Sequence, residues 1–468
     1  MRASRTRRVA DRRGGGHRAP RQRSWSRLDP AAALPITFIV ACLLFGGPLG
    51  ALTPPFALLL LIGGALVVVA VARGWSDAFQ TLPLAVRLAV AGWVALPFLQ
   101  LVPLPPAWWR ALPGAGLRLE VLSAFGLQHH WMPLSVSPIE TAYCAAMALA
   151  MFGLLLAALH VGERTMRTFL ATAAGVVLLG AAIGVIQFAS GGSALQFYAA
   201  ADHSALIGFF TNKNHMGLAL ACLAPLLHVL VARRGAIRGD VGGFVAISVA
   251  LLSLIVATNS RAALLLGAIA IAATALSRYP ERRRLVAVVL AALAAAAVLA
   301  SLAIPSIGHL AERLGRSGDD VRGDFLAWSR PLASLYGPVG AGFGSFPDIF
   351  PPSEQLAWVK PTQLNAVHND YLQLYIEGGI VGVAVLVWSL AVLAVVGART
   401  IWAGVGTEAG AVTRRETDLA WMGGVIVVLF ALHSVADYPA RRAATLTLLV
   451  LAVACVLRPT ARRRLPAC

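Results

Sequence analysis

The chain has 468 residues, of which 58% are hydrophobic and 13% are charged. Soluble domains are about 45–50% apolar and about 25% charged, so this composition excludes an ordinary soluble globule. The formal net charge of +18 rests almost entirely on arginine, because Lys213 and Lys360 are the only lysines, and a mean hydropathy of +0.74 does not fit a nucleic-acid-binding domain.

About twelve apolar segments are long enough to cross a bilayer, since a membrane-spanning helix needs about 17 to 25 residues and satisfies its own backbone hydrogen bonds. These segments predict an all-α integral membrane protein with about 12 transmembrane helices and a large extracytoplasmic loop between helices 9 and 10. The predicted spans are 34–52, 56–72, 82–102, 139–159, 168–189, 214–232, 243–258, 262–277, 285–304, 371–398, 419–437 and 443–457.

Arginine is unevenly distributed among the connections, and short cytoplasmic loops accumulate Arg and Lys. With the N-terminus inside, the first 33 residues supply ten arginines and every inside connection adds at least one more. We therefore expect both termini in the cytoplasm. The predicted organisation is a disordered Arg-rich tail (1–33), transmembrane helices 1–9 (34–304), a functional loop outside the cytoplasm (305–370), transmembrane helices 10–12 (371–457) and a cytoplasmic tail (458–468).

Metal and redox chemistry find little support in the sequence. The five cysteines are scattered and form no CxxC pair, so no disulfide or zinc framework is indicated. Asp319, Asp320 and Asp324, even with His309, match no recognised calcium or zinc spacing. We predict neither a metal nor a cofactor.

Polar residues gather in four segments that the predicted topology places on one side of the membrane. These are TNKNH (211–215), TNSR (258–261), the polar part of the long loop (313–344) and HNDY (368–371). They can converge on one outward-facing cleft. Because the planar guanidinium of arginine pairs bidentately with phosphate oxygens, Arg261 and Arg322 are candidates for gripping a lipid pyrophosphate. The alternative is that each arginine only extends to lipid headgroups.

His368 is a candidate general base, because it follows a long polar loop and precedes an apolar helix, and because a neutral imidazole can take a proton from a hydroxyl. The alternative for a lone histidine is a hydrogen bond at the helix entrance. The glycine-rich run that contains Gly342 and Gly344 predicts a tight turn that brings backbone N–H groups near the ligand.

Four stretches, in this order, resemble the O-antigen ligase and polymerase superfamily of the bacterial inner membrane. They are FFTNKNHMG (209–217), NSRAALLLG (259–267), GPVGAGFGSF (337–346) and HNDYLQLYIEGGIVG (368–382). In the ligases of this superfamily the residue after the last glycine is usually Gly, Thr or Tyr, whereas here it is Val383. The superfamily therefore fits better than its ligase subtype.

The resemblance implies an inverting, metal-independent glycosyl transfer at the periplasmic face. The donor is a glycan on undecaprenyl pyrophosphate, and the acceptor is a sugar hydroxyl of lipid A core in a ligase or of a growing polysaccharide in a polymerase. The implied catalytic residue is His368, and the implied pyrophosphate-binding residues are Arg261 and Arg322, with Lys213 adding charge and Arg316 or Arg330 as alternatives to Arg322. The supporting residues are Asn369, Asn212, Asn214, Ser260, Gly342 and Gly344.

Two other classes of function compete with this interpretation. A transporter should carry ionisable residues at mid-membrane on broken helices and an internal repeat, and the sequence shows neither. A purely structural membrane scaffold leaves the outside arginines without a reason. The expected partners are the lipid bilayer, the lipid-linked donor and the glycan acceptor, with no nucleic acid.

Overall fold

The structure is a computed structural model. It describes residues 32–47, 53–198, 205–231, 241–279, 321–355, 359, 364–405 and 411–462. The Arg-rich N-terminal tail and the predicted ninth span (285–304) lie outside these residues, as does Arg316.

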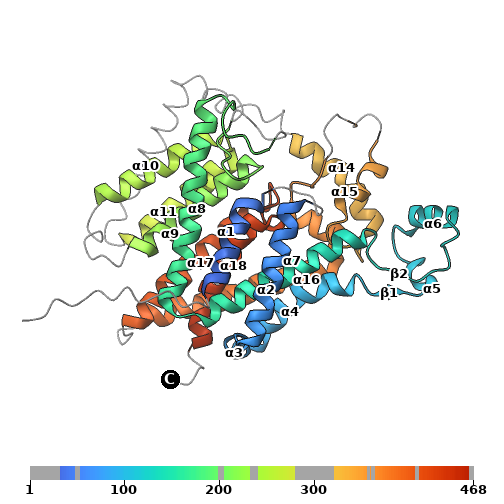
Figure 1. The fold of residues 1–468 in the computed structure, drawn as a ribbon, viewed down its shortest axis with the longest axis horizontal. Coiled ribbons are helices and arrows are strands. Elements are labelled where there is room, and N and C mark those ends of the chain that lie inside the picture. The colour runs from blue at the N-terminus through green and yellow to red at the C-terminus, as the bar shows by residue number, and fades with distance from the viewer. Residues whose placement is uncertain are drawn as a thin grey trace, which may run out of the picture.

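The described chain is almost entirely helical, and the helices are arranged as a bundle with smaller elements at its ends (Figure 1). The helices are α1 (Ala33–Phe45), α2 (Pro54–Ala72), α3 (Ser76–Gln80), α4 (Leu84–Leu99), α5 (Pro106–Trp109), α6 (Ala115–Ala124), α7 (Pro138–His160), α8 (Glu163–Ala189), α9 (Lys213–Val231), α10 (Val241–Ala257), α11 (Arg261–Arg278), α14 (Val321–Tyr336), α15 (Phe346–Ile349), α16 (Asp370–Val405), α17 (Ala411–His433) and α18 (Ala443–Arg462), with 3₁₀ turns η4 (Pro351–Ser353) and η6 (Pro439–Arg441).

Eight of the described helices are long and apolar enough to cross a membrane, namely α2, α7, α8, α9, α11, α16, α17 and α18. Three shorter apolar helices, α1, α4 and α10, accompany them. One small antiparallel pair, β1 (Pro103–Leu104) with β2 (Met132–Pro133), lies in the connection between α4 and α7. The chain is thus an all-α, multi-pass membrane protein, as the composition predicts.

Small residues let the main helix pairs of the bundle approach closely, as membrane helices commonly do. At three contacts a glycine of one helix lies directly against an alanine of the next, where an added methyl group would collide. The pairs are Gly63 of α2 with Ala150 of α7, Gly217 of α9 with Ala263 of α11, and Gly423 of α17 with Ala452 of α18.

Arginines cap two helices at the end of the bundle where α3 and the last turn of α18 lie. We call this the opposite end, because the candidate site lies at the other end of the bundle. Arg458 donates from Nη2 to the Val161 carbonyl at 2.7 Å and from Nη1 to the Ala158 carbonyl. Arg167 donates to the carbonyls of Val229 and Leu230 at the end of α9. The last carbonyls of a helix lack partners and carry partial negative charge, so these cations stabilise the ends of α7 and α9.

The predicted loop 305–370 is not structureless in its described part. It contains α14, α15 and η4, which lie beside the start of α16 (Figure 1). These elements have their own apolar core, formed by Leu332, Tyr336, Phe346, Phe350, Val367 and Ile376 among others. We call this unit the cap, and the end of the bundle that carries it the site end.

Helix α16 is broken at Gly379, whose φ of 61° and ψ of −161° lie outside the helical region. The glycine-rich run of the cap fills the break. Ala341 and Gly342 donate their N–H groups to the carbonyls of Ile376 and Glu377, and Ile380 donates to the Pro338 carbonyl. These bonds satisfy backbone groups that the break exposes, so the first two turns of α16 are joined to the cap.

Candidate functional site

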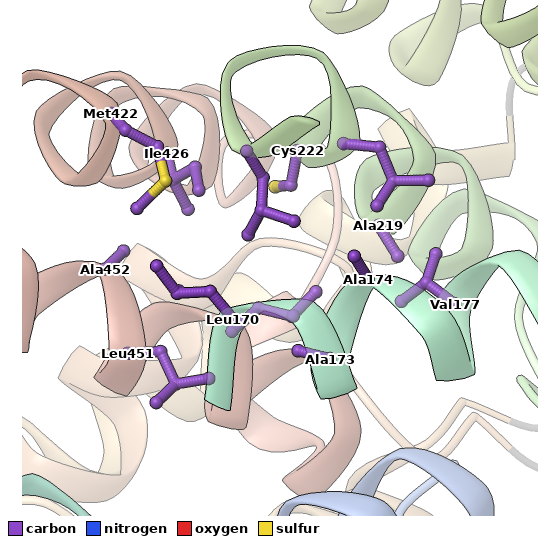
Figure 2. A pocket seen from close by; sticks show the side chains of 13 residues that line it. Leu170, Ala173, Ala174, Val177, Ala219, Cys222, Met422, Ile426, Leu451 and Ala452 are labelled. Atoms are coloured by element: carbon purple, nitrogen blue, oxygen red, sulfur yellow. The ribbon is translucent and has the colours of Figure 1, made fainter. Parts of the chain in front are cut away.

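An apolar pocket lies inside the bundle between α8, α9, α17 and α18 (Figure 2). Its lining is aliphatic apart from the sulfur-containing Cys222 and Met422, and no lining residue is charged. Such a lining offers no group that can bind a phosphate or accept a proton from a sugar hydroxyl. A cluster of charged and polar side chains lies instead at the site end.

Asp437 is the centre of a buried polar cluster there. It lies in the loop between α17 and α18 and has no exposure to solvent. Its Oδ2 accepts a hydrogen bond from Nδ2 of Asn214 at 2.6 Å, and Nδ2 of Asn212 lies 3.3 Å from the same oxygen. Two amide groups near the start of α9 therefore hold one carboxylate.

Three histidines face this carboxylate. Nδ1 of His368 lies 3.2 Å from Oδ1, Nε2 of His215 lies 3.8 Å from Oδ1, and Nε2 of His433 lies 3.9 Å from Oδ2. The His368 contact is within ion-pair distance, although it lacks the alignment of a hydrogen bond. The His368 side chain is 21% exposed, whereas His215 and His433 are buried. Of the three, His368 is the most accessible to an incoming molecule.

The surroundings of Asp437 keep it ionised. Burial by itself would raise the pKa of this carboxyl group, but the interaction with His368 and the charges of His215 and His433 outweigh burial and hold the pKa below its usual value. A permanently negative Asp437 can orient an imidazole and stabilise its protonated form.

The backbone of His368 adopts a left-handed conformation, with φ at 58°. Such a φ is uncommon for a residue with a side chain, and it occurs most often where the surrounding structure requires it. The imidazole lies between two aromatic rings, with ring centroids 5.2 Å from Phe325 of α14 and 4.8 Å from Tyr438. The cap and the α17–α18 loop thus fix the ring from both sides.

Asn369 connects His368 to the loop that carries Asp437. Its Oδ1 accepts the N–H of Leu372 at 2.9 Å, which caps the first turn of α16, and its Nδ2 donates to the Val435 carbonyl at 2.9 Å. The Asn369 side chain therefore caps the helix that follows His368 and also binds the α17–α18 loop two residues before Asp437.

A chain of hydrogen bonds joins the starts of α9 and α11 to the carboxylate. Ser260 caps α11 by accepting the N–H of Ala263, and its hydroxyl donates to Oδ1 of Asn214 at 2.6 Å. Asn214 in turn donates to Asp437. Three of the residues predicted from sequence, Asn212, Asn214 and Ser260, therefore meet around a residue that the sequence analysis did not name.

Two of the predicted cationic residues are the first residues of the two helices that these hydrogen bonds connect. Lys213 is the first residue of α9 and Arg261 the first residue of α11, and both side chains are partly buried. Each is adjacent in sequence to a member of the hydrogen-bonded chain. Because helix N-termini carry partial positive charge, the two helix ends and the two cations together favour an anion at the site end.

The third predicted cation, Arg322, lies in the first turn of α14, three residues before Phe325, whose ring contacts His368. Its side chain lies outside what the structure describes. Arg330, an alternative to it, is exposed on the same helix.

Gly342 and Gly344 do not join the Asp437 cluster. Gly342 donates its N–H to the Glu377 carbonyl, and Gly344 donates to Oε2 of Glu377 at 3.1 Å. Gly342 has a φ of 105°, and a side chain there would collide with Ser135. These N–H groups are directed to α16 rather than to a ligand, and the glycines serve the close docking of the cap.

The structure adds an ion network that the sequence analysis missed. Arg441 donates from Nε to Oδ1 of Asp370 at 3.2 Å and from Nη1 to Oε2 of Glu377 at 2.5 Å. Gln373 also donates to the buried Glu377. The signal was available, since DYPARR (437–442) places an acid and two arginines in a short connection predicted to face outward. The sequence analysis overlooked this connection because the predicted span 419–437 continued past His433, where α17 ends.

No group of three or more His, Cys, Asp or Glu side chains is arranged to hold a metal ion among the residues that the structure describes. The fold and the cluster together define a multi-pass helical membrane protein with a charged, histidine-containing site at one end of its bundle.

Comparison with known families adds a match to one family of membrane proteins. Residues 246–387 match the family model described as O-antigen ligase. This match covers less than half of the chain, and it supports the resemblance to the O-antigen ligase and polymerase superfamily drawn from the sequence motifs. The match includes Arg261, Arg322 and His368, whereas Asp437 lies beyond it. A search of curated proteins finds no match.

Proposed function

We propose that the protein transfers a glycan from undecaprenyl pyrophosphate to a sugar hydroxyl at the periplasmic face of the bacterial inner membrane. The family match supports the reaction class. The arginines that cap α7 and α9 at the opposite end support a cytoplasmic location for that end, since cytoplasmic ends of spans are enriched in arginine. The site end then faces the periplasm, where lipid-linked glycans are used.

The observation that carries the proposal is the contact between His368 and the buried, ionised Asp437. With Nδ1 facing the carboxylate, the other ring nitrogen, Nε2, is the one left to take a proton. The acceptor hydroxyl gives this proton to Nε2 as its oxygen attacks the anomeric carbon from the side opposite the leaving group, which inverts that carbon. Asp437 stabilises the imidazolium that forms, as a carboxylate does in a catalytic triad.

The leaving group is the lipid pyrophosphate, on which negative charge increases as the glycosidic bond breaks. Fixed cations that meet this charge contribute most to the rate. Arg261 and Lys213, at the starts of α11 and α9, supply such charge in the proposal, together with Arg322 at the start of α14. Because pyrophosphate is already a good leaving group, the proposed reaction uses neither a metal nor a nucleotide.

The acceptor decides between two enzymes of the same superfamily. A hydroxyl of lipid A core makes the protein an O-antigen ligase, and a hydroxyl of a growing chain makes it a polysaccharide polymerase. Deleting the protein separates them: long glycan left on the carrier lipid indicates a ligase, and single repeat units attached to the core, or missing exopolysaccharide, indicate a polymerase.

The substitution His368→Ala tests the proposed base. We expect normal amounts of the variant in the membrane and loss of the surface glycan, measured by gel analysis of cell-surface polysaccharide. His130→Ala is the matched control, because His130 is an exposed histidine remote in sequence from the Asp437 cluster. Normal glycan in the His368 variant would refute the role of His368.

A further inference from the structure

Arg442 is a buried arginine whose hydrogen-bonding groups are only partly used. It lies between η6 and α18 and is 3% exposed. Its Nη2 donates to the Tyr438 hydroxyl at 3.2 Å, and its Cζ lies 4.9 Å from the centre of the Tyr438 ring. In the described structure Nε and Nη1 are buried and have no hydrogen-bond partner.

Other buried arginines of the described chain are better satisfied. Arg458 donates to two helix carbonyls, and Arg441 forms ion pairs with Asp370 and Glu377. Burying a guanidinium without partners is unfavourable by several kcal/mol, since a charged group loses its hydration without compensation. A neutral phenol such as Tyr438 compensates little of this. Arg442 is therefore the buried cation whose arrangement calls for an anion.

Tyr438 places this cation at the proposed reaction centre. Its ring lies 4.8 Å from the His368 ring and 5.0 Å from the His215 ring, measured between centroids. Arg442 contacts the same tyrosine. Only one aromatic side chain thus separates the guanidinium from the imidazole that is proposed to act as the base.

The neighbouring carboxylates do not accept hydrogen bonds from Nε or Nη1 of Arg442, although the charge of Asp437 acts on it. Asp437 faces the amides and histidines already described, while Asp370 and Glu377 are engaged by Arg441. The starts of α9 and α11, with Lys213 and Arg261, add positive charge at this end of the bundle. An acceptor for Nε and Nη1 of Arg442 therefore has to come from a ligand, and the positive charge at this end favours an anionic one.

We propose that Arg442 binds a phosphate oxygen of the carrier-lipid pyrophosphate, with Nε and Nη1 as the donors. This inference rests on the proposed glycosyl transfer and deepens it, because it assigns to Arg442 a part of the pyrophosphate site. The guanidinium stays charged at any working pH and offers its donors in a fixed plane, which suits phosphate oxygens. The bound phosphate accepts hydrogen bonds from Nε and Nη1 of Arg442 and supplies a negative charge next to its guanidinium.

The proposal makes opposite predictions for stability and for binding at one residue. Arg442→Met removes an uncompensated charge, so the ligand-free protein should unfold at the same temperature as the wild type or higher. The same variant should bind the carrier lipid about ten- to a hundredfold more weakly, the loss expected for a charge-assisted hydrogen bond. A merely structural arginine would not show this separation.

The experiment uses the full chain in lipid nanodiscs and follows the midpoint of thermal unfolding as undecaprenyl pyrophosphate is added. Arg458→Met is the matched control, because it removes a buried arginine from the other end of the same helix. We expect Arg458→Met to lower the unfolding midpoint when no undecaprenyl pyrophosphate is present. Its midpoint should still rise as much as that of the wild type when undecaprenyl pyrophosphate is added. Arg442→Lys, which retains the charge and loses the planar donors, should recover part of the affinity.

Three results would overturn the proposal. Wild-type affinity in Arg442→Met would remove Arg442 from the pyrophosphate site, and this outcome leaves the glycosyl transfer to the His368→Ala test. A ligand-free midpoint that falls in Arg442→Met as far as in Arg458→Met would mean that the guanidinium is a structural group. An equal, Arg442-dependent response to phosphatidylglycerol nanodiscs without probe would mean that a phospholipid headgroup, rather than the carrier, is the anion.

Discussion

Two buried arginines, one just before α18 and one in its last turns, are in opposite situations. Arg458, 2% exposed, donates to the carbonyls that end α7. Arg442, 3% exposed, has one neutral partner and two nitrogens without any among the described residues. Residue type and burial are the same, so the difference lies in what the surrounding chain offers. The comparison shows that unsatisfied donors, rather than charge or burial, distinguish the arginine proposed to bind a ligand from the arginine that stabilises the fold.

The contrast extends to the two ends of the bundle. At the opposite end arginines meet helix C-termini, and the fold itself satisfies them. At the site end α9 and α11 begin, so the helix ends are positive and cannot satisfy a cation. Arg441 is neutralised there by Asp370 and Glu377, and the remaining positive charge favours an anionic ligand.

Asp437→Asn should have the largest effect of the changes that sharpen this comparison. Asparagine keeps the size of the side chain but can no longer stabilise an imidazolium at His368. By analogy with the aspartate of a catalytic triad, we expect glycan transfer to fall by about 10⁴-fold. An assay of transfer from lipid-linked donor in membranes measures this, and a loss under tenfold would contradict the role of Asp437.

Arg441→Met should destabilise the site end most. It leaves Asp370 and the fully buried Glu377 as uncompensated charges, and breaking a buried pair in this way costs about 3–5 kcal/mol. The midpoint of unfolding in detergent should drop clearly below that of Arg442→Met. Equal midpoints for the two variants would break the distinction between the neighbouring arginines.

Arg458→Met should have a smaller effect at the opposite end. Each lost hydrogen bond from a charged group to a carbonyl is worth about 1.5–3 kcal/mol, offset in part by relief from burying a charge. Stability should fall while glycan transfer per folded molecule stays at the wild-type level. A lower rate of glycan transfer per folded molecule in Arg458→Met would show that the opposite end also takes part in the reaction.

The smallest change is expected on mild acidification. The folded protein holds the pKa of Asp437 below its unfolded value of about 3.9, so the stability from this group is present above that value. It is lost as pH falls through the lower pKa of the folded state. The gap in unfolding midpoint between wild type and Asp437→Asn should therefore stay constant from pH 7 to about pH 5 and narrow below about pH 4. A constant gap at all pH values would contradict a depressed pKa.

Most of the helices and half of the cluster could be predicted from sequence for simple reasons. Long apolar runs fold as helices because the bilayer leaves the backbone no other partners. Asn212, Asn214, Ser260 and His368 were recognisable because each interrupts or ends such a run. The structure assembles these four around one carboxylate, although their chemical roles remain proposals.

The other half of the cluster was hidden by its local context. Asp437 falls at the end of the predicted span 419–437, where a single acid resembles a helix terminus. Arg441 and Arg442 are neighbours with opposite roles, and only their contacts in space distinguish them. Helix α14 was missed because Arg322, Asp324 and Arg330 keep it from being an apolar span, although Trp328, Leu332 and Tyr336 recur at helical spacing on the face that packs in the cap core.

The break in α16 at Gly379 has a mechanical consequence. The two turns that follow His368 are bonded to the cap, while the longer remainder of the helix runs through the bundle. A thinner or thicker bilayer tilts or shifts spanning helices to match their apolar length. Because Gly379 divides the helix, such tilting can be absorbed at the hinge before it reaches the imidazole, and we expect turnover to vary little among vesicles of different acyl-chain length.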